Sequence, residues 1–206
     1  MVVDIETSGV DVRRHGILSI GAVDFSMPGN TFYGECRLRT GASLDEDALA
    51  YNGFSKAYIR SDERITEGAL MKRFAEWMKG VKDTTIAGHN VHFDLSFLRK
   101  AAKAHRVNIS FGNRIVDMHT LAYASLAGRG MEVPLQMNRT AITSDFVFRY
   151  VGLHDEPRPH NALTGAKMEA EALSRLIYGR GLLGEYAKLK IPAHLLHTGH
   201  RKIPKP

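Results

Sequence analysis

The chain opens with MVVDIE, a strongly β-forming run that carries two acids two residues apart. Successive side chains of a strand point to opposite faces, so Asp4 and Glu6 share one face while Val3 and Ile5 point to the other. The two carboxylates then lie roughly 6–7 Å apart, where their repulsion is costly inside a sheet. A divalent cation beside them resolves the conflict, and oxygen ligands suit Mg²⁺ or Mn²⁺. The alternative is a strand end at which both acids reach solvent.

Two more strands are predicted directly after this one. Residues 17–25 and 31–39 are β-forming runs, and the sequence MPGN at 27–30 is a turn signal between them. Short connections of this kind join antiparallel neighbours. The first 40 residues therefore predict a three-stranded antiparallel meander.

Helical and extended patterns alternate in the remaining chain. The pattern predicts, in order, a helix at 65–80, a strand at 84–90, a helix at 92–106, a strand at 114–117, and helices at 143–153 and 160–179. Strands that alternate with helices after a meander imply a mixed central sheet with helices packed on it.

The size and composition are those of one globular domain. The chain has 206 residues, 44% of them hydrophobic, and no apolar run approaches the ~20 residues that span a bilayer. We expect a single domain at 1–190 and a basic tail at 191–206, which is either a phosphate-contacting arm or a frayed end. Cys36 is the only cysteine, so a cytoplasmic location is expected. The net charge of +6 suits a polyanionic partner.

Two later stretches carry further polar groups. The sequence GHNVHFDLSFL at 88–98 ends a strand and begins a helix with Asp94 in its first turn, and His89 and Asn90 lie at the strand's carboxyl end. Such ends are where sites of α/β folds tend to lie, although an acid there also suits the helix dipole. His160 precedes the last helix, where a lone histidine is most often a cap or a surface residue.

Together, DIETSG, GHNVHFDLSFL and HNALTGAKMEAEAL resemble, in their order, the three motifs of the DEDDh branch of the DEDD exonuclease superfamily. The resemblance spans about residues 1–178. It implies a ribonuclease H-like fold, with a mixed five-stranded sheet of three antiparallel and two parallel strands flanked by helices. It also implies a metal-dependent 3′–5′ exonuclease that uses two Mg²⁺ or Mn²⁺ ions and releases nucleoside 5′-monophosphates from single-stranded DNA or RNA. A polymerase or repair complex is a partner that the resemblance allows, and the oligomeric state stays open.

The same resemblance implies roles for individual residues. Asp4 would contact both ions, Glu6 one ion and Asp94 the other. His160 would be the general base, and the ordinary pKa of histidine near neutrality suits that role. Thr7 and Gly9 belong to a turn that would lie near the terminal nucleotide, although an ordinary polar turn explains them equally well.

One position departs from the family pattern, because Gly165 stands where a fourth metal-binding aspartate is expected. Glu169 lies one helical turn further on, projects to nearly the same side, and is our candidate for the missing acid. Glu171 is expected on the solvent side, paired with Arg175 at i+4. An aspartate introduced at 165 is expected to keep or raise activity. The alternative is a weakened site, and with it a catalytically impaired nucleic-acid-binding domain; a phosphoesterase of small nucleotides is a third reading.

The helix at 92–106 offers candidates for substrate contact. Asn90 precedes it, and Phe97 is expected to lie against the terminal bases, whereas Phe93 is expected in the core. Its cationic residues are explained equally well by phosphate contact and by a solvated face: Arg99, Lys100, Lys103 and Arg106.

Overall fold

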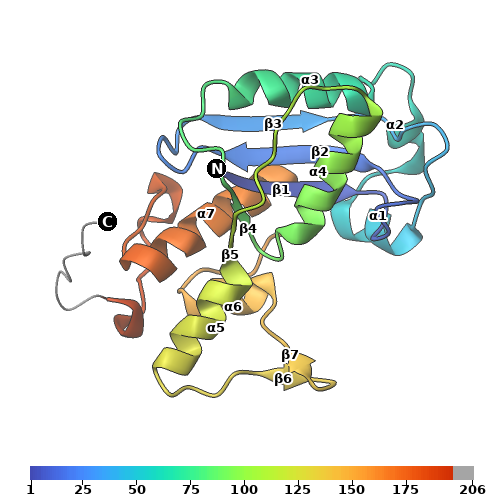
Figure 1. Ribbon diagram of the computed structural model, residues 1–206. Helices are drawn as coiled ribbons and strands as arrows, with labels where there is room; N and C mark the ends of the chain where they lie inside the picture. Colours follow the sequence, from blue (N-terminus) through green and yellow to red (C-terminus); the bar gives the residue numbers. More distant parts are fainter. Residues whose placement is uncertain (197–206) are drawn as a thin grey trace.

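A computed structural model describes residues 1–196 and shows one five-stranded sheet flanked by helices (Figure 1). The strands are β1 (Val2–Thr7), β2 (Ile17–Val23), β3 (Thr31–Glu35), β4 (Ile86–Gly88) and β5 (Ile115–Asp117). Their order in the sheet is β3-β2-β1-β4-β5. β1, β2 and β3 are antiparallel neighbours, and β4 and β5 continue the sheet in parallel with β1. The predicted mixed sheet is confirmed.

The helices alternate with the strands after the meander. They are α1 (Glu46–Asn52), α2 (Lys56–Arg60), α3 (Glu67–Met78), α4 (His92–Ala104), α5 (Met118–Gly128), α6 (Ser144–Tyr150) and α7 (Ala162–Tyr178), with short 3₁₀ helices at Gly184–Tyr186 and Ala193–Leu195. Side-chain caps fix several of their starts, because a free backbone N–H at a helix N-terminus needs an acceptor. Thr66 accepts from the N–H of Ala69, and Asn161 accepts from the N–H groups of Leu163 and Thr164.

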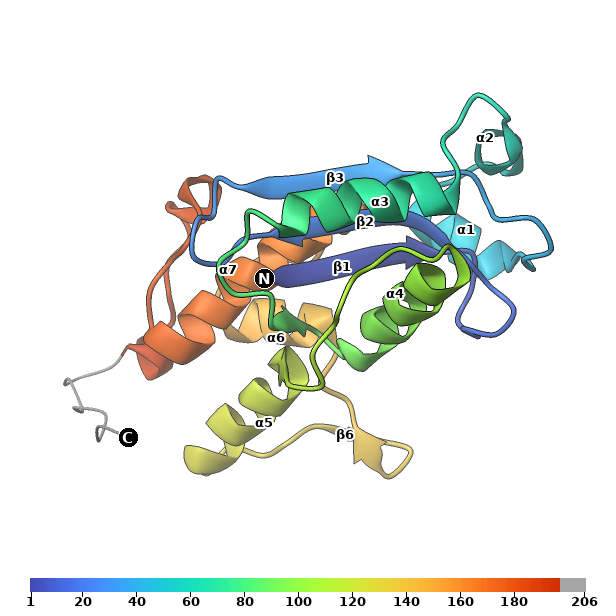
Figure 2. The ribbon, with the colours of Figure 1, turned by 45° about the horizontal axis from the view of Figure 1, so that its top comes forward.

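Two hydrophobic layers cover the two faces of the sheet. Val3 and Ile5 of β1 join one buried cluster with apolar side chains of α3 and α4. Val2, on the opposite face, joins a second cluster with α5, α6 and α7. Figures 1 and 2 show α3 and α4 on one side of the sheet and α7 on the other. The alternation that places Asp4 and Glu6 on one face of β1 therefore directs them toward α7.

Gly21 determines how closely α7 can approach the sheet. It lies opposite Asp4 in the β1–β2 register. A Cβ at this position would lie 2.1 Å from the backbone carbon and oxygen of Ala162. Only glycine permits this contact, which brings the first turn of α7 over the two acids of β1.

Several short elements were not predicted from the sequence. α1 and α2 lie in a polar stretch without a long apolar period, and their starts are marked only by the caps Asp45 and Ser55. The sequence pattern also does not predict α5 or the hairpin of β6 (Leu135–Gln136) and β7 (Arg139–Thr140). The hairpin extends away from the sheet in both views (Figures 1 and 2).

The chain beyond α7 folds back onto this helix. Arg175 donates to the carbonyl oxygens of Tyr186 and Leu189, and Glu171 accepts from the N–H groups of Leu182 and Leu183. The predicted pair of Glu171 and Arg175 is present, with Nε and Oε1 2.7 Å apart. The prediction that Glu171 faces solvent was wrong, because this returning segment covers it completely.

The end of the described chain carries little of the predicted basic tail. Leu195 is buried in the second hydrophobic cluster, and residues 197–206 of the predicted tail lie outside the described residues. Among residues 1–196, no helix has the length and apolar character needed to cross a bilayer.

Candidate active site

The site lies where β1 and β4 separate. The parallel pairing of these two strands is confined to Val2 and Ala87. Further along β1, the N–H of Ile5 donates instead to Oδ1 of Asp94 at 3.2 Å. Asp94 occupies the first turn of α4 and is buried, so this bond fixes its carboxylate beside the two acids of β1.

A pocket of about 510 Å³ occupies this opening. Acids from β1, α4 and α7 and the predicted base line it: Asp4, Glu6, Asp94, Glu169 and His160. The sequence motifs thus converge in space, as the family pattern predicts. Glu156 also lines the pocket and was missed from the sequence.

Glu169 projects from the second turn of α7 toward β4. Its Oε1 accepts a hydrogen bond from the N–H of His89 at 3.1 Å, and its Oε2 is buried without a partner. This orientation agrees with the expectation that Glu169 faces the predicted metal ligands. A buried carboxylate oxygen without a partner is costly and needs a cation or a proton.

Gly165 faces the carboxylate of Asp4. A Cβ added at Gly165 would lie 2.0 Å from Oδ2 of Asp4 and 3.3 Å from Oε1 of Glu156. The expectation that an aspartate at 165 keeps or raises activity stays a prediction, and in this geometry it requires the Asp4 side chain to move. In this chain the Asp4 carboxylate occupies the space of a side chain at 165, and a larger residue would displace it.

Glu156 lies in the loop between α6 and α7, four residues before His160. Its Oε2 is 3.1 Å from Nδ1 of His160, and its side chain is 6% exposed. Its Oε1 is buried and has no hydrogen-bond partner. No periodic pattern or motif marks this residue in the sequence. A carboxylate at i−4 from a histidine was the one local signal available.

Burial raises the pKa values of these acids, and for several of them the charges of neighbouring acids raise the pKa further. Burial raises the pKa of Glu6 to about 8, with the charges of Glu156 and Asp94 adding to it. Burial likewise raises the pKa of Asp94 to about 8 and that of Glu156 to about 7. The pKa of Asp4 is raised by burial and then by the charge of Glu169. Such a cluster is tolerated in its ionised form only beside a cation.

His160 is held by contacts with Tyr51 and Glu156. The backbone N–H of His160 donates to the carbonyl oxygen of Tyr51 at 3.1 Å, and the centres of the two rings lie 4.0 Å apart. Burial lowers the pKa of its imidazole, which favours the neutral ring that a general base needs. With Nδ1 facing Glu156, Nε2 is the ring nitrogen left to accept that proton.

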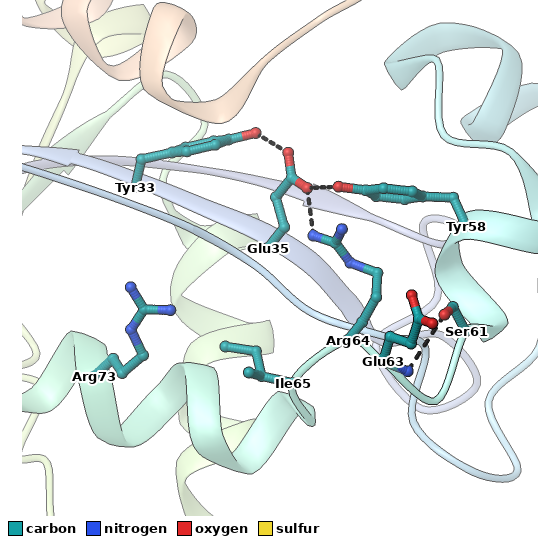
Figure 3. A pocket seen from close by; sticks show the side chains of 8 residues that line it. All are labelled: Tyr33, Glu35, Tyr58, Ser61, Glu63, Arg64, Ile65 and Arg73. Atoms are coloured by element: carbon teal, nitrogen blue, oxygen red, sulfur yellow. Dashed lines mark hydrogen bonds and ion pairs between the residues drawn. The ribbon is translucent and has the colours of Figure 1, made fainter.

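A second polar pocket is lined by residues of β3, α2 and α3 and of the loop that joins these two helices (Figure 3). Asn161, next to His160, donates to the hydroxyl of Tyr33 at 2.9 Å. Tyr33 and Tyr58 both donate to Glu35, which Arg64 contacts at 2.6 Å. This network ties the capping residue of α7 to the edge strand β3, and so anchors the backbone that carries His160.

Three of the four predicted substrate-binding residues line the pocket, and one does not. Thr7, Gly9 and Asn90 line the pocket. Phe97 does not line it; it is 2% exposed and belongs to the core under the sheet, so its predicted stacking role was wrong. Phe93, which was expected in the core, packs against that cluster and also lines the pocket. The two share a helix face in sequence, but α4 turns only its first turn toward the opening.

The cationic residues of α4 do not form a uniformly free surface. Arg99 donates to the carbonyl oxygen of Gly112 at 2.9 Å and to Asn113 at 2.8 Å. Lys100 donates to the carbonyl oxygen of Val12. Arg99 and Lys100 therefore hold neighbouring loops in place. Lys103 and Arg106 are the exposed cations of the set.

The residues present fit a divalent cation. The donors are carboxylate oxygens, two of which are buried without partners, on Glu156 and Glu169. Over the described residues, no three acidic, histidine or cysteine side chains already stand at the spacing of a metal-ligand cluster.

Known proteins share both the sequence pattern and the fold. The exonuclease family model RNase_T matches residues 1–173. Ribonuclease T of Yersinia enterocolitica is 26% identical over 189 residues, which are 86% of this chain and 83% of that protein. Ribonuclease T of Salmonella choleraesuis is 28% identical over 139 residues, which are 62% of this chain and 65% of that protein.

Solved structures of exonucleases have the same architecture. The nuclease domain of 3′hExo, a DEDDh family member bound to rAMP, superimposes with a TM-score of 0.63 at 17% identity, covering 93% of this chain and 94% of that one. E. coli exonuclease I in complex with a dA16 oligonucleotide gives a TM-score of 0.65 at 18% identity, covering 87% and 40%. The fold is ribonuclease H-like, as predicted. With its motifs, its fold and the family match in agreement, the chain belongs to the RNase T-type exonuclease family of DEDDh nucleases.

Proposed function

We propose that this nuclease is a metal-dependent 3′–5′ exonuclease that releases nucleoside 5′-monophosphates from single-stranded nucleic acid. The observation that carries the proposal is the convergence of Asp4, Glu6, Asp94 and Glu169 with His160 on one pocket. The four acids would hold two Mg²⁺ or Mn²⁺ ions. Bound there, the ions would stabilise the attacking and leaving oxygens of an in-line displacement.

The residues of the chain divide the remaining work. His160 accepts the proton of the attacking water through Nε2, because Nδ1 faces Glu156. The water oxygen bonds to phosphorus as the bond to the 3′ oxygen of the preceding nucleotide breaks. Thr7, Gly9 and Asn90 are the pocket residues available to hold the terminal nucleotide, and Phe93 supplies the aromatic surface that was expected of Phe97.

The test is strand shortening by the full chain. A 5′-labelled single-stranded DNA and its RNA counterpart are incubated with Mg²⁺ or Mn²⁺, and a ladder shortening from the 3′ end is expected. Glu169→Gln keeps the acceptor for the N–H of His89 but removes the charge, and about a hundredfold loss of rate is expected. The exposed Glu132→Gln is the matched control. Full activity of Glu169→Gln would remove Glu169 from the ligand set.

A catalytically impaired nucleic-acid-binding domain is the second candidate, and Gly165 favours it, because the family's aspartate is absent there. The same assay separates the two. Binding of the labelled strands without any shortening would support the binding domain. The salt dependence of that binding reports how many phosphates the chain contacts.

A further inference from the structure

Glu156 is a buried acid that the family motifs do not include. Its side chain is 6% exposed although it belongs to a loop, and loops rarely bury a carboxylate without a reason. The loop is held in place, because the N–H of Glu156 donates to Oδ1 of Asp145 at 3.2 Å. The loop end is fixed as well, by the contact of His160 with the carbonyl oxygen of Tyr51.

The two oxygens of Glu156 face different partners. Oε2 lies 3.1 Å from Nδ1 of His160. Oε1 points the other way, is buried, and has no hydrogen-bond partner among the described residues. A carboxylate with its two oxygens in different surroundings can contact two neighbours at once, one through each oxygen.

The oxygen of Glu156 without a partner lies beside the place where a side chain at 165 would begin, next to the Asp4 carboxylate that fills this place. Oε1 of Glu156 and Oδ2 of Asp4 both lie within 3.3 Å of the point where a Cβ at 165 would stand. A side chain at 165 would start from that point. The carboxylate of Glu156 therefore stands beside the place where the family's fourth acid would begin, and reaches it from the preceding loop.

We propose that Glu156 joins the metal site to the general base: its Oε1 is a ligand of the divalent ion beside Asp4, and its Oε2 positions His160 by accepting the Nδ1 proton. The inference rests on the proposed function for its metal, and it makes Glu156 a metal ligand and a positioning residue. Metal-bound histidines and bases elsewhere are oriented by carboxylates in the same manner. With Gly165 in place of the family's aspartate, Glu156 would supply a negative charge to the ion and would also orient the ring of His160.

Two variants separate the two roles of this side chain. Glu156→Gln keeps the size and one oxygen, which can still accept from Nδ1, but removes the charge offered to the ion. Glu156→Ala removes both contacts. Glu132→Gln, an exposed acid distant from these contacts, is the control. Cooperative thermal unfolding of each variant establishes that it is folded.

The readouts need no nucleic acid. Mn²⁺ binding is followed by electron paramagnetic resonance on the full chain, and the protonated ring nitrogen of His160 is identified from its ¹⁵N chemical shifts with Mg²⁺ present. Mn²⁺ affinity is expected to fall about 10- to 100-fold in both variants. The proton is expected on Nδ1 in the wild type and in Glu156→Gln, and on Nε2 in Glu156→Ala.

Wild-type Mn²⁺ affinity in Glu156→Gln, or an unchanged proton position in Glu156→Ala, overturns the proposal. These results are independent of the strand-shortening assay. If the wild type shortened oligonucleotides while both readouts stayed unchanged, this inference alone would fall. If it bound Mn²⁺ through Glu156 but shortened no strand, the exonuclease proposal would fall.

Discussion

At the residue scale, Asp4 and Gly165 are matched across the opening between β1 and α7. The Asp4 carboxylate fills the space that a side chain at 165 would take. The family's aspartate is absent at 165, and the retained Asp4 takes up the space that this side chain would need. Glu156 and Glu169 supply carboxylates from two other directions around the same acids.

Gly165→Ala should disturb this match. The added methyl group would displace the Asp4 carboxylate from its place in the pocket, and roughly a tenfold to hundredfold loss of activity is expected, equivalent to about 1–3 kcal/mol of activation free energy. Thermal stability is a poor readout, because alanine also favours the helix. Gly128→Ala is the control, since a Cβ at Gly128 meets open space. Equal exonuclease rates in both variants would show that Asp4 can move freely.

The raised pKa values of the acids predict a pH-dependent stability. Glu6 and Asp94 ordinarily titrate near 4.5 and 3.8, and burial raises both pKa values to about 8. The folded, metal-free protein thus holds more protons than the unfolded chain between these limits. Its free energy of unfolding falls as the pH rises from about 4 to 8.

Asp94→Asn tests this at one position, because the amide oxygen can still accept from the N–H of Ile5. In EDTA the variant is expected to melt several degrees above the wild type at pH 8 and close to it at pH 3.5. Mg²⁺ should raise the melting temperature of the wild type at pH 8 more than that of the variant. Identical melting curves at pH 8 would mean that ionisation of Asp94 does not destabilise the folded protein.

At the element scale, the approach of α7 to β2 sets the depth of the site. A Cβ at Gly21 would lie 2.1 Å from backbone atoms of Ala162, which cannot yield as a flexible side chain can. Gly21→Ala should cost about 3 kcal/mol or more of the free energy of unfolding in urea. Gly29→Ala, where a Cβ meets nothing within 4 Å, is the control. A loss of less than about 1 kcal/mol would contradict the packing described for α7.

The buried pair of Glu171 and Arg175 holds the returning C-terminal segment against α7. Arg175→Ala leaves the Glu171 charge buried, and a loss of about 3–5 kcal/mol is expected in denaturant unfolding. Lys79→Ala breaks the exposed pair with Glu76 and should cost about 0–1 kcal/mol. Comparable losses in the two variants would argue against the covering role of residues 180–191.

The sequence predicted the five strands of the sheet and helices α3, α4, α6 and α7, but not α1, α2, α5 or the hairpin of β6 and β7. The alternation of the first strands and the 3.6-residue period of α3, α4 and α7 are local signals, and the structure confirms these elements. The burial of Glu171 depends on a segment that returns from further along the chain, which no helical period reveals. Helical period could not separate Phe93 from Phe97 either, because only the tertiary packing of α4 brings Phe93 and not Phe97 to the pocket.

At the scale of the whole molecule, the site is assembled from parts far apart in the chain. β1 brings Asp4 and Glu6, α4 brings Asp94, and α7 brings Glu169, from opposite sides of one sheet. The motif order predicted Asp4, Glu6 and Asp94, whereas Glu169 became a candidate only from its place one helical turn after Gly165. Glu156 could not be predicted, since its place depends on how the loop after α6 folds over the start of α7.

Anomalous scattering from crystals of the full chain grown with Mn²⁺ tests the central claim most directly. The account predicts anomalous peaks between β1 and α7, with carboxylate oxygens of Asp4, Glu6, Asp94 and Glu169 within about 2.0–2.6 Å of the ions. Mn²⁺ found only at other surfaces, with the acids of this pocket still uncoordinated, would contradict it.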